Sequence, residues 1–143
     1  MKKQIIVKRY HRYDKTRDVL YRGSCEFEKK DHSIILRYQE NNKDANVTCE
    51  VIAACDHIEI KRSGETKSTL YFEAGKQTKG ILTSPYGEIE ITLFTYRYLR
   101  KENVITLEYD ILHGENIDSG YRILWSIKEG HYEAQVFVSP AGP

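Results

Sequence analysis

Residues 105–111 read ITLEYDI, a strict alternation of apolar and polar side chains. In an extended chain, a period of two puts every apolar side chain on one face and every polar side chain on the other. Such a strand suits an antiparallel sheet that has one face against a core and the other face in water. The stretch therefore predicts a half-buried β-strand.

The same alternation returns along most of the chain, at residues 25–29, 34–38, 47–53, 57–61, 70–74, 88–93 and 123–127. Turn-forming residues separate these runs, and no window of eleven or more residues carries the apolar stripe of a helix. Consecutive strands are joined most simply as an up-and-down meander, and closing the meander removes its exposed edges. The sequence predicts an all-β fold, a single closed antiparallel barrel of about 8–10 strands.

The apolar phase changes within residues 89–99. Apolar side chains occupy odd positions up to Leu93, and even positions from Phe94 onward. A β-bulge near Phe94, or a bend in one long strand at a barrel corner, accounts for this change.

The composition indicates one folded domain. The chain has 143 residues, of which 40% are hydrophobic and 30% are charged, and these values exclude a disordered chain. We expect a barrel over residues 1–138 and a disordered tail over residues 139–143, which read SPAGP.

The sequence also predicts a cytoplasmic protein without a membrane partner. No apolar run approaches the ~18 residues that a membrane span needs, and the N-terminal segment lacks the long apolar region of a signal peptide. The chain has an odd number of cysteines, Cys25, Cys49 and Cys55, so they cannot all pair within it. Free thiols fit a reducing compartment.

The near-neutral net charge of +1 hides an asymmetry. Residues 1–22 carry eight basic and two acidic side chains, a net charge of +6, whereas residues 23–143 carry −5. A basic N-terminal segment on an acidic body raises the question of an acidic partner.

Five segments from residue 58 onward form an ordered set of marks: 58–64 (IEIKRSG), 70–75 (LYFEAG), 83–91 (TSPYGEIEI), 105–111 and 122–129 (RILWSIKE). Their order resembles the YwiB-like family of uncharacterised bacterial β-barrel proteins. The fold of that family is calycin-like, related in shape to lipocalins and fatty-acid-binding proteins. The resemblance implies a closed, mainly antiparallel barrel in the bacterial cytoplasm, and it implies no established activity.

One cation and several aromatic side chains are candidates for a pocket inside the barrel. A barrel of this size either fills its interior with side chains or holds one small ligand. Arg62 could hold an anionic group there, because a buried guanidinium needs an anionic or strongly accepting partner. The predicted ligand-binding residues are Arg62, Tyr86, Tyr96, Tyr109 and Trp125. The alternative is that Arg62 pairs with Glu59, Glu73 or Glu108, or lies in solvent, while Tyr109 and Trp125 belong to the core.

A second candidate site lies in the basic N-terminal segment, where cations alternate with aromatic rings. Its predicted nucleic-acid-binding residues are Lys8, Arg9, Tyr10, Arg12 and Tyr13, through phosphate contact and base stacking. The alternative is an exposed edge strand that charge keeps from aggregating. Nucleic-acid-binding domains are usually basic overall, and the near-neutral net charge argues against this partner.

The sequence offers little for catalysis or for a metal ion. Cys55 and His57 lie two residues apart, but no second pair completes a zinc site, so we expect buried thiols and an exposed turn histidine. The carboxylates of Glu108 and Asp110 alternate with apolar residues, which indicates the wet outer face of a barrel. The sequence contains no P-loop, GxGxxG, GxSxG or HExxH pattern. We therefore expect no metal, no cofactor and no enzymatic activity, and a Cys or carboxylate hydrolase is the least favoured alternative.

Together these observations predict a non-enzymatic protein, monomeric or homodimeric, that binds a small amphipathic or anionic ligand inside its barrel. This prediction depends on fold-level analogy. The alternative is an accessory protein that contacts RNA or an acidic protein partner through its basic N-terminal strand.

Overall fold

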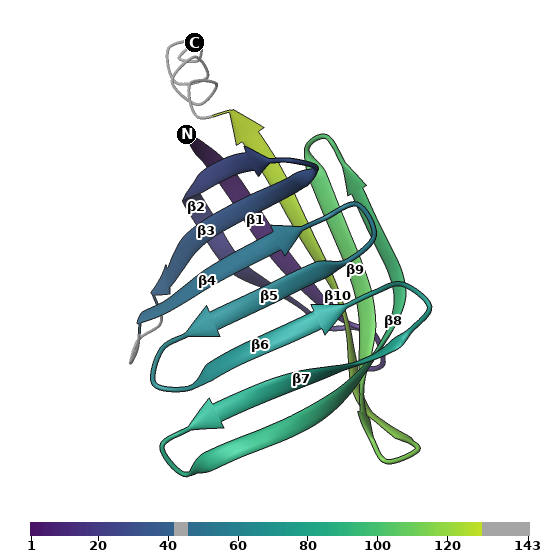
Figure 1. Ribbon diagram of the computed structural model, residues 1–143. Helices are drawn as coiled ribbons and strands as arrows, with labels where there is room; N and C mark the ends of the chain where they lie inside the picture. The colour runs from purple at the N-terminus through teal and green to yellow at the C-terminus, as the bar shows by residue number, and fades with distance from the viewer. Residues whose placement is uncertain (42–45, 130–143) are drawn as a thin grey trace.

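The computed structural model describes residues 1–41 and 46–129, and this part of the chain consists of strands and turns (Figure 1). The strands are β1 (Lys2–His11), β2 (Arg17–Lys30), β3 (Ser33–Asn41), β4 (Asn46–Ala53), β5 (Ile58–Ser63), β6 (Lys67–Phe72), β7 (Gln77–Ser84), β8 (Gly87–Lys101), β9 (Val104–His113) and β10 (Asn116–Glu129). All the alternating runs predicted from the sequence lie largely or wholly on these strands.

The ten strands form one closed barrel in which every strand pairs antiparallel with its neighbours in sequence, and β1 pairs with β10 (Figure 1). The predicted all-β, up-and-down barrel is thus confirmed, with ten strands. Interpreting the basic segment as an edge strand is wrong, because β1 is paired on both sides. Ile5, for example, pairs with Gly23 of β2 and with Ile127 of β10.

The side chains of alternate strand residues point inward and pack together as the core of the barrel. On β4, Cys49, Val51 and Ala53 are each 1% exposed or less, whereas the intervening residues reach solvent. The largest fully buried side chains are Trp125, Phe72, Ile5, Leu36, Ile58, Leu93, Ile105 and Leu107. Burial of apolar surface on this scale is the main force that holds such a barrel closed.

The change of phase in residues 89–99 is a β-bulge. The pairing register between β8 and β9 shifts between Thr95 and Arg97, within three residues of the predicted position at Phe94. Leu93 and Thr95 are buried, and after the bulge Tyr98 turns inward against the core. The extra residue therefore moves the inward face of β8 from odd to even positions.

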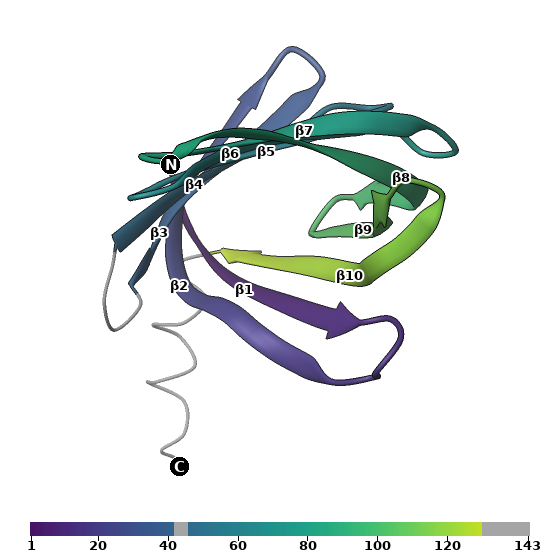
Figure 2. The ribbon, with the colours of Figure 1, turned by 90° about the horizontal axis from the view of Figure 1, so that it is seen from below.

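Hydrogen bonds to backbone carbonyls close the barrel at the end where β8 runs into β9. Arg100 Nη1 donates to the carbonyls of His32 and Ala53 at 2.6 and 2.7 Å. The Tyr98 hydroxyl donates to the carbonyl of Ala54 at 2.6 Å, and burial raises the pKa of this phenol to about 12. At the opposite end lie the β1–β2, β5–β6, β7–β8 and β9–β10 connections. A view from below shows β1, β2 and β10 facing β4 to β7 across the interior (Figure 2).

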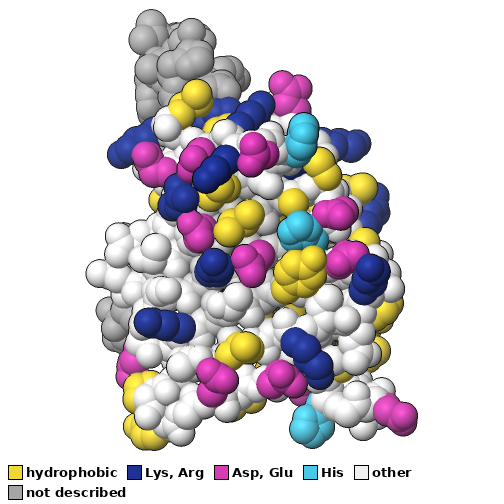
Figure 3. Space-filling view, in the orientation of Figure 1, with side chains coloured by type: hydrophobic (Ala, Val, Ile, Leu, Met, Phe, Trp, Pro, Cys, Tyr) yellow, Lys and Arg dark blue, Asp and Glu magenta, His cyan; other side chains and the backbone are white. Residues whose placement is uncertain are grey.

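The outer face over β3 to β7 carries acidic and basic side chains interspersed with apolar ones (Figure 3). Within the described residues, no helix has the length and apolar character to cross a membrane. The tail over residues 139–143, predicted to be disordered, lies outside the described residues.

Candidate functional site

Four polar or aromatic side chains from four strands gather inside the half of the barrel away from the closed end. We call them the inner cluster: Arg9 of β1, Arg62 of β5, Tyr109 of β9 and Tyr121 of β10. The Arg9 guanidinium lies 5.2 Å from the Tyr121 ring centroid, and the Tyr109 and Tyr121 rings are 5.7 Å apart. Burial raises the pKa of Tyr109, and the charges of both arginines act on this phenol in the opposite direction.

Arg62 is paired inside the barrel with a carboxylate that the sequence analysis did not consider. Its Nη2 donates to Glu40 Oε1, and the Glu40 side chain is only 7% exposed. Burial lowers the pKa of Arg62, but the charge of Glu40 and the neighbouring Cys49 outweigh burial and raise it overall. Burial and the charge of Glu40 also raise the pKa of Cys49 to about 11.

Arg62 pairs with Glu40 and not with Glu59, Glu73 or Glu108, its predicted alternative partners. Glu59 pairs with Lys61 at 3.8 Å, and Glu73 pairs with Lys76 at 2.6 Å. Glu40 reaches Arg62 because β3, β4 and β5 are neighbours, and in their register Tyr38, Cys49 and Arg62 stand side by side. Glu40 follows Tyr38 by two residues on the same inward face.

Arg9 has a partner of its own near the β1–β2 connection. Its Nη2 donates to Asp18 Oδ2 at 3.0 Å, and His11 Nε2 lies 3.0 Å from the same oxygen. The hydrogen bonds from His11 and Arg9 lower the pKa of Asp18. The His11 ring also packs edge-on against Tyr121, at 5.1 Å between centroids. The two arginines of the inner cluster are thus each held by a carboxylate.

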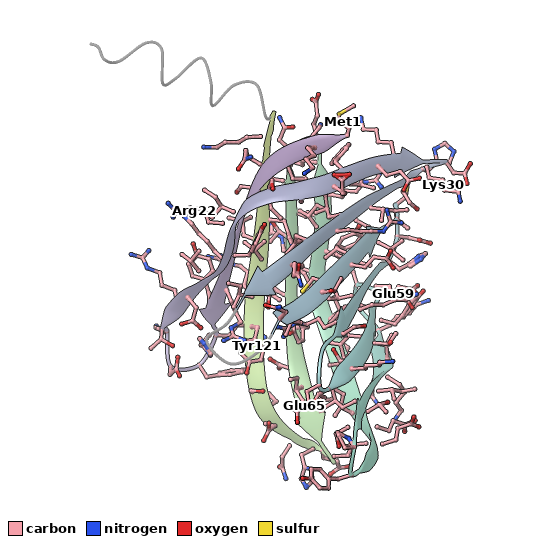
Figure 4. The ribbon with its side chains drawn as sticks, turned by 90° about the vertical axis from the view of Figure 1, so that its left-hand side faces the viewer. Met1, Arg22, Lys30, Glu59, Glu65 and Tyr121 are labelled. Carbon is pink, nitrogen blue, oxygen red and sulfur yellow. The ribbon has the colours of Figure 1, made fainter. Side chains whose placement is uncertain are left out.

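A pocket of about 330 Å³ opens beside Arg62. Its lining residues are Val47, Arg62, Glu65, Thr66, Ser68 and Leu82. This volume is at the lower end of the range for small-molecule sites. Figure 4 shows Tyr121 and Glu65 in the half of the barrel away from Met1.

The structure divides the predicted ligand-binding residues. Arg62 lines the pocket and Tyr109 lies in the inner cluster. Trp125 is 1% exposed and donates its Nε1–H to the Tyr38 hydroxyl at 3.3 Å, so it is part of the packed core. Tyr86 is 99% exposed in the β7–β8 turn, and its predicted place inside the barrel is wrong because a turn residue at a hairpin tip points into water.

Tyr96 belongs to a different cluster, on the outside of the barrel. Its hydroxyl donates to Asp110 Oδ2 at 2.7 Å, and the Tyr13 hydroxyl lies 2.8 and 2.9 Å from the two oxygens of the same carboxylate. Arg12 Nη1 donates to Asp110 Oδ1 at 2.8 Å. A Cβ on Gly120 would overlap Asp110 and Tyr13, so only glycine allows this approach. We call this group the Asp110 clamp.

The clamp overturns one expectation about the outer face. Asp110 points outward from β9 as predicted, yet it is 0% exposed, because the β1–β2 connection folds over it. An outward carboxylate can therefore be buried when a loop covers it and supplies its hydrogen bonds.

The five predicted nucleic-acid-binding residues do not share a surface. Arg9 points into the barrel, and Arg12 and Tyr13 hold Asp110. Tyr10 lies on the outer face, where the Arg122 guanidinium sits 4.5 Å from its ring centroid. The RNA-contact interpretation stays a prediction, but these five residues do not carry it together.

A different set of cations surrounds Lys8 on the outer face of β1 and β2. A pocket of about 300 Å³ there is lined by Lys8, Arg17, Asp18, Val19 and Arg22. Asp18, its one acidic residue, already binds Arg9 and His11. We call Lys8, Arg17 and Arg22 the outer basic face.

The cysteines and histidines do not come together as a metal site. Cys25 and Cys49 are buried free thiols, Cys55 is an exposed one, and burial raises the pKa of Cys25 to about 11. His57 is partly exposed and bonds Asp56 at 2.7 Å. Among residues 1–41 and 46–129, no group of three or more potential ligands is placed to hold a metal ion.

Glu40, Tyr121 and the inward direction of Arg9 were not predicted from the sequence, although each residue lies in the inward phase of its strand. Arg9 continues the inward series begun by Ile5 and Val7, and Glu40 continues the series that ends in Tyr38. A charged residue in the inward phase of a barrel strand marks a polar interior.

Comparisons with known proteins agree with the resemblance drawn from the sequence. Residues 5–124 match the family described as "Domain of unknown function (DUF1934)". The crystal structure of the ywiB protein from Bacillus subtilis has a TM-score of 0.75 and 22% identity, over 90% of this chain and 92% of that chain. At this identity the likeness shows the fold alone. A search of curated proteins found no match.

Proposed function

The chain belongs to the DUF1934 family, and from that premise we propose that it binds a small amphipathic, anionic ligand inside its barrel without catalysing a reaction. One observation carries the proposal. Arg62 is held by an interior carboxylate and still lines a pocket of about 330 Å³. Its side chain is 43% exposed, so a ligand can reach the guanidinium.

The walls around Arg62 suit a ligand with both polar and apolar parts. Val47 and Leu82 line the pocket together with the hydroxyls of Thr66 and Ser68. Leu70 and Ile91 are partly buried inward side chains on the neighbouring strands β6 and β8. Mostly apolar walls with a few placed polar groups are typical of small-molecule sites.

The fluorescent anion 1-anilinonaphthalene-8-sulfonate combines a charge with apolar rings and tests this proposal. We expect its emission to rise and shift to the blue on addition of the protein. Arg62→Gln should weaken its binding roughly tenfold, because a charged hydrogen bond is lost. A fluorescence titration measures both effects.

Arg37→Gln is the matched control, because Arg37 lies on the outer face and pairs with Glu28 and Glu50. This variant should bind the probe as the parent protein does. Circular dichroism checks that both variants remain folded. An absent emission change, or equal losses in the two variants, would contradict the proposal.

The outer basic face supports a second candidate function, contact with RNA. Lys8, Arg17 and Arg22 surround a pocket, and the first 22 residues carry a net charge of +6. Cations spaced along paired strands can follow a phosphate backbone.

Replacing Lys8, Arg17 and Arg22 together with alanine tests the second candidate. We expect retention on immobilised polyuridine to fall and its dependence on salt to become shallower, because binding through fewer phosphate contacts releases fewer counterions. Alanine at Lys61, Lys67 and Lys79, on β5 to β7 across the barrel, removes the same charge as a control (Figure 2). Equal retention of both triple variants would rule out the outer basic face as the contact.

A further inference from the structure

The three cations of the outer basic face have no side-chain partner in the described part of the chain. Lys8, Arg17 and Arg22 line one pocket of about 300 Å³ outside β1 and β2. Within residues 1–41 and 46–129, none of the three forms a side-chain hydrogen bond, an ion pair or a ring contact. Figure 4 shows Arg22 on the opposite side of the barrel from Glu59. Three positive charges therefore face one small space without a carboxylate to offset them.

The one acidic residue of this pocket is already neutralised. Asp18 Oδ2 accepts a hydrogen bond from Arg9 Nη2 at 3.0 Å and lies 3.0 Å from His11 Nε2. The Arg9–Asp18 pair carries no net charge, so the pocket keeps the charge of its three other cations. Inside the barrel, by contrast, the cation of Arg62 is offset by Glu40. The outer pocket is thus the one of these two places with positive charge left for an anion.

A β-bulge arranges the cations around one point. The pairing register between β1 and β2 shifts just before Lys8. On one side of Lys8, Arg17 pairs with Tyr10, and on the other side Arg22 pairs with Ile6. Outward positions on a strand are about 7 Å apart, a distance that an extended arginine side chain spans. Both guanidiniums can therefore reach the space beside Lys8, and bulges often serve to direct side chains in this way.

The charge of the pocket favours a phosphomonoester over other anions. Such a group carries about −1.5 to −2 charges near pH 7 and three strong acceptor oxygens. A carboxylate or a phosphodiester has a single negative charge and would leave part of the positive charge unpaired. Guanidiniums bind phosphate oxygens in pairs of parallel hydrogen bonds, and a lysine adds a compact positive charge. A phosphomonoester therefore offers an oxygen to each of the three cations.

An aromatic ring and an apolar side chain lie next to the cations. Tyr10 stands between Arg17 of β2 and Arg122 of β10 in the strand register, and the Arg122 guanidinium is 4.5 Å from its ring centroid. Val19 lines the pocket and is 53% exposed. Nucleic-acid bases stack on tyrosine rings and on guanidinium planes. These surroundings suit a nucleotide, in which a base is attached close to a phosphate.

We infer that the outer basic face binds the phosphomonoester of a nucleotide, with Lys8, Arg17 and Arg22 donating hydrogen bonds to its oxygens. The inference rests on the outer basic face proposed above as an RNA contact, and it adds the chemical group that this face recognises. The 5′-phosphate end of a single-stranded RNA and a free mononucleotide share this chemistry. The inference does not depend on the ligand proposed for the barrel interior.

Fluorescence anisotropy with two uridine hexamers, each labelled at its 3′ end, tests the inference at one fixed salt concentration. One hexamer carries a 5′-phosphate and the other a 5′-hydroxyl. We expect the phosphorylated hexamer to bind at least tenfold more tightly. Arg17→Gln and Arg22→Gln should each weaken its binding roughly tenfold and leave the hydroxyl hexamer much less affected. Competition by uridine 5′-monophosphate shows which source the pocket prefers.

The cations of another pocket provide the matched control. Lys29 and Lys101 line a pocket of about 290 Å³ at the closed end of the barrel, which also contains the carboxylates of Asp31 and Glu102. Lys29→Gln and Lys101→Gln should leave the preference for the 5′-phosphate unchanged, and circular dichroism checks that every variant is folded.

Three outcomes separate the inference from the RNA contact on which it rests. If both hexamers bind equally tightly, the phosphomonoester inference fails while the RNA contact stands. If neither hexamer binds and the mononucleotide does not bind, both fail. If uridine 5′-monophosphate competes as strongly as the unlabelled phosphorylated hexamer, the phosphomonoester inference holds and a free mononucleotide is its source.

Discussion

Asp110→Ala is expected to lower the free energy of unfolding by about 3–5 kcal/mol. The carboxylate is 0% exposed and receives hydrogen bonds from Arg12, Tyr13 and Tyr96. Removing it leaves a partly buried guanidinium and two phenols without their acceptor, and it releases the β1–β2 connection from β9. Urea unfolding followed by circular dichroism measures the change.

Glu108 gives the matched control because it lies two residues earlier on the same outward face of β9, partly exposed. Glu108→Ala should cost well under about 1 kcal/mol, as surface charges generally do. Equal losses for the two variants would show that the clamp contributes nothing beyond an ordinary surface carboxylate.

The clamp should also weaken at alkaline pH. The hydrogen bond to Asp110 raises the pKa of Tyr96, and burial together with the same carboxylate raises that of Tyr13. A raised pKa means that the neutral phenol is favoured in the folded state, so its contribution is complete below the ordinary tyrosine pKa near 10. The difference in stability between the parent protein and Asp110→Ala should therefore shrink as pH rises above that value.

The fold could be predicted because alternation is a local property. The alternation within each strand indicates which of its side chains face the core. The bulge of β8 is also visible in the sequence, as a change of phase between Leu93 and Phe94. Closure followed from the cost of leaving edges unpaired. The turns between the runs predicted about 8–10 strands, and the structure has ten.

Part of the candidate site can be predicted by extending the alternation of inward-facing residues to the end of each strand. Arg62 continues the inward series of β5, and Arg9 and Glu40 continue those of β1 and β3 in the same way. The burial of Asp110 could not be predicted in this way, because it depends on a loop from residues nearly a hundred positions away. Local pattern gives the direction of a side chain, and only the tertiary fold gives what covers it.

Trp125→Ala is expected to lower the free energy of unfolding by about 3–5 kcal/mol. Trp125 is among the largest of the fully buried side chains, at 1% exposed. Its loss leaves a cavity and removes the donor to the Tyr38 hydroxyl, which is itself on a buried residue. Because this is the chain's one tryptophan, unfolding is best followed by circular dichroism, which does not depend on indole fluorescence.

Two variants separate the structural role of Trp125 from a role in ligand contact. Tyr86→Ala removes an aromatic ring that is 99% exposed, so it should change the stability by less than about 0.5 kcal/mol. Trp125→Phe keeps most of the apolar volume, and we expect binding of 1-anilinonaphthalene-8-sulfonate to persist in this variant while stability falls. If Trp125→Phe abolished binding in a folded protein, the indole would belong to the ligand site. The site would then extend from the inner cluster toward the closed end of the barrel, into what we describe as the packed core.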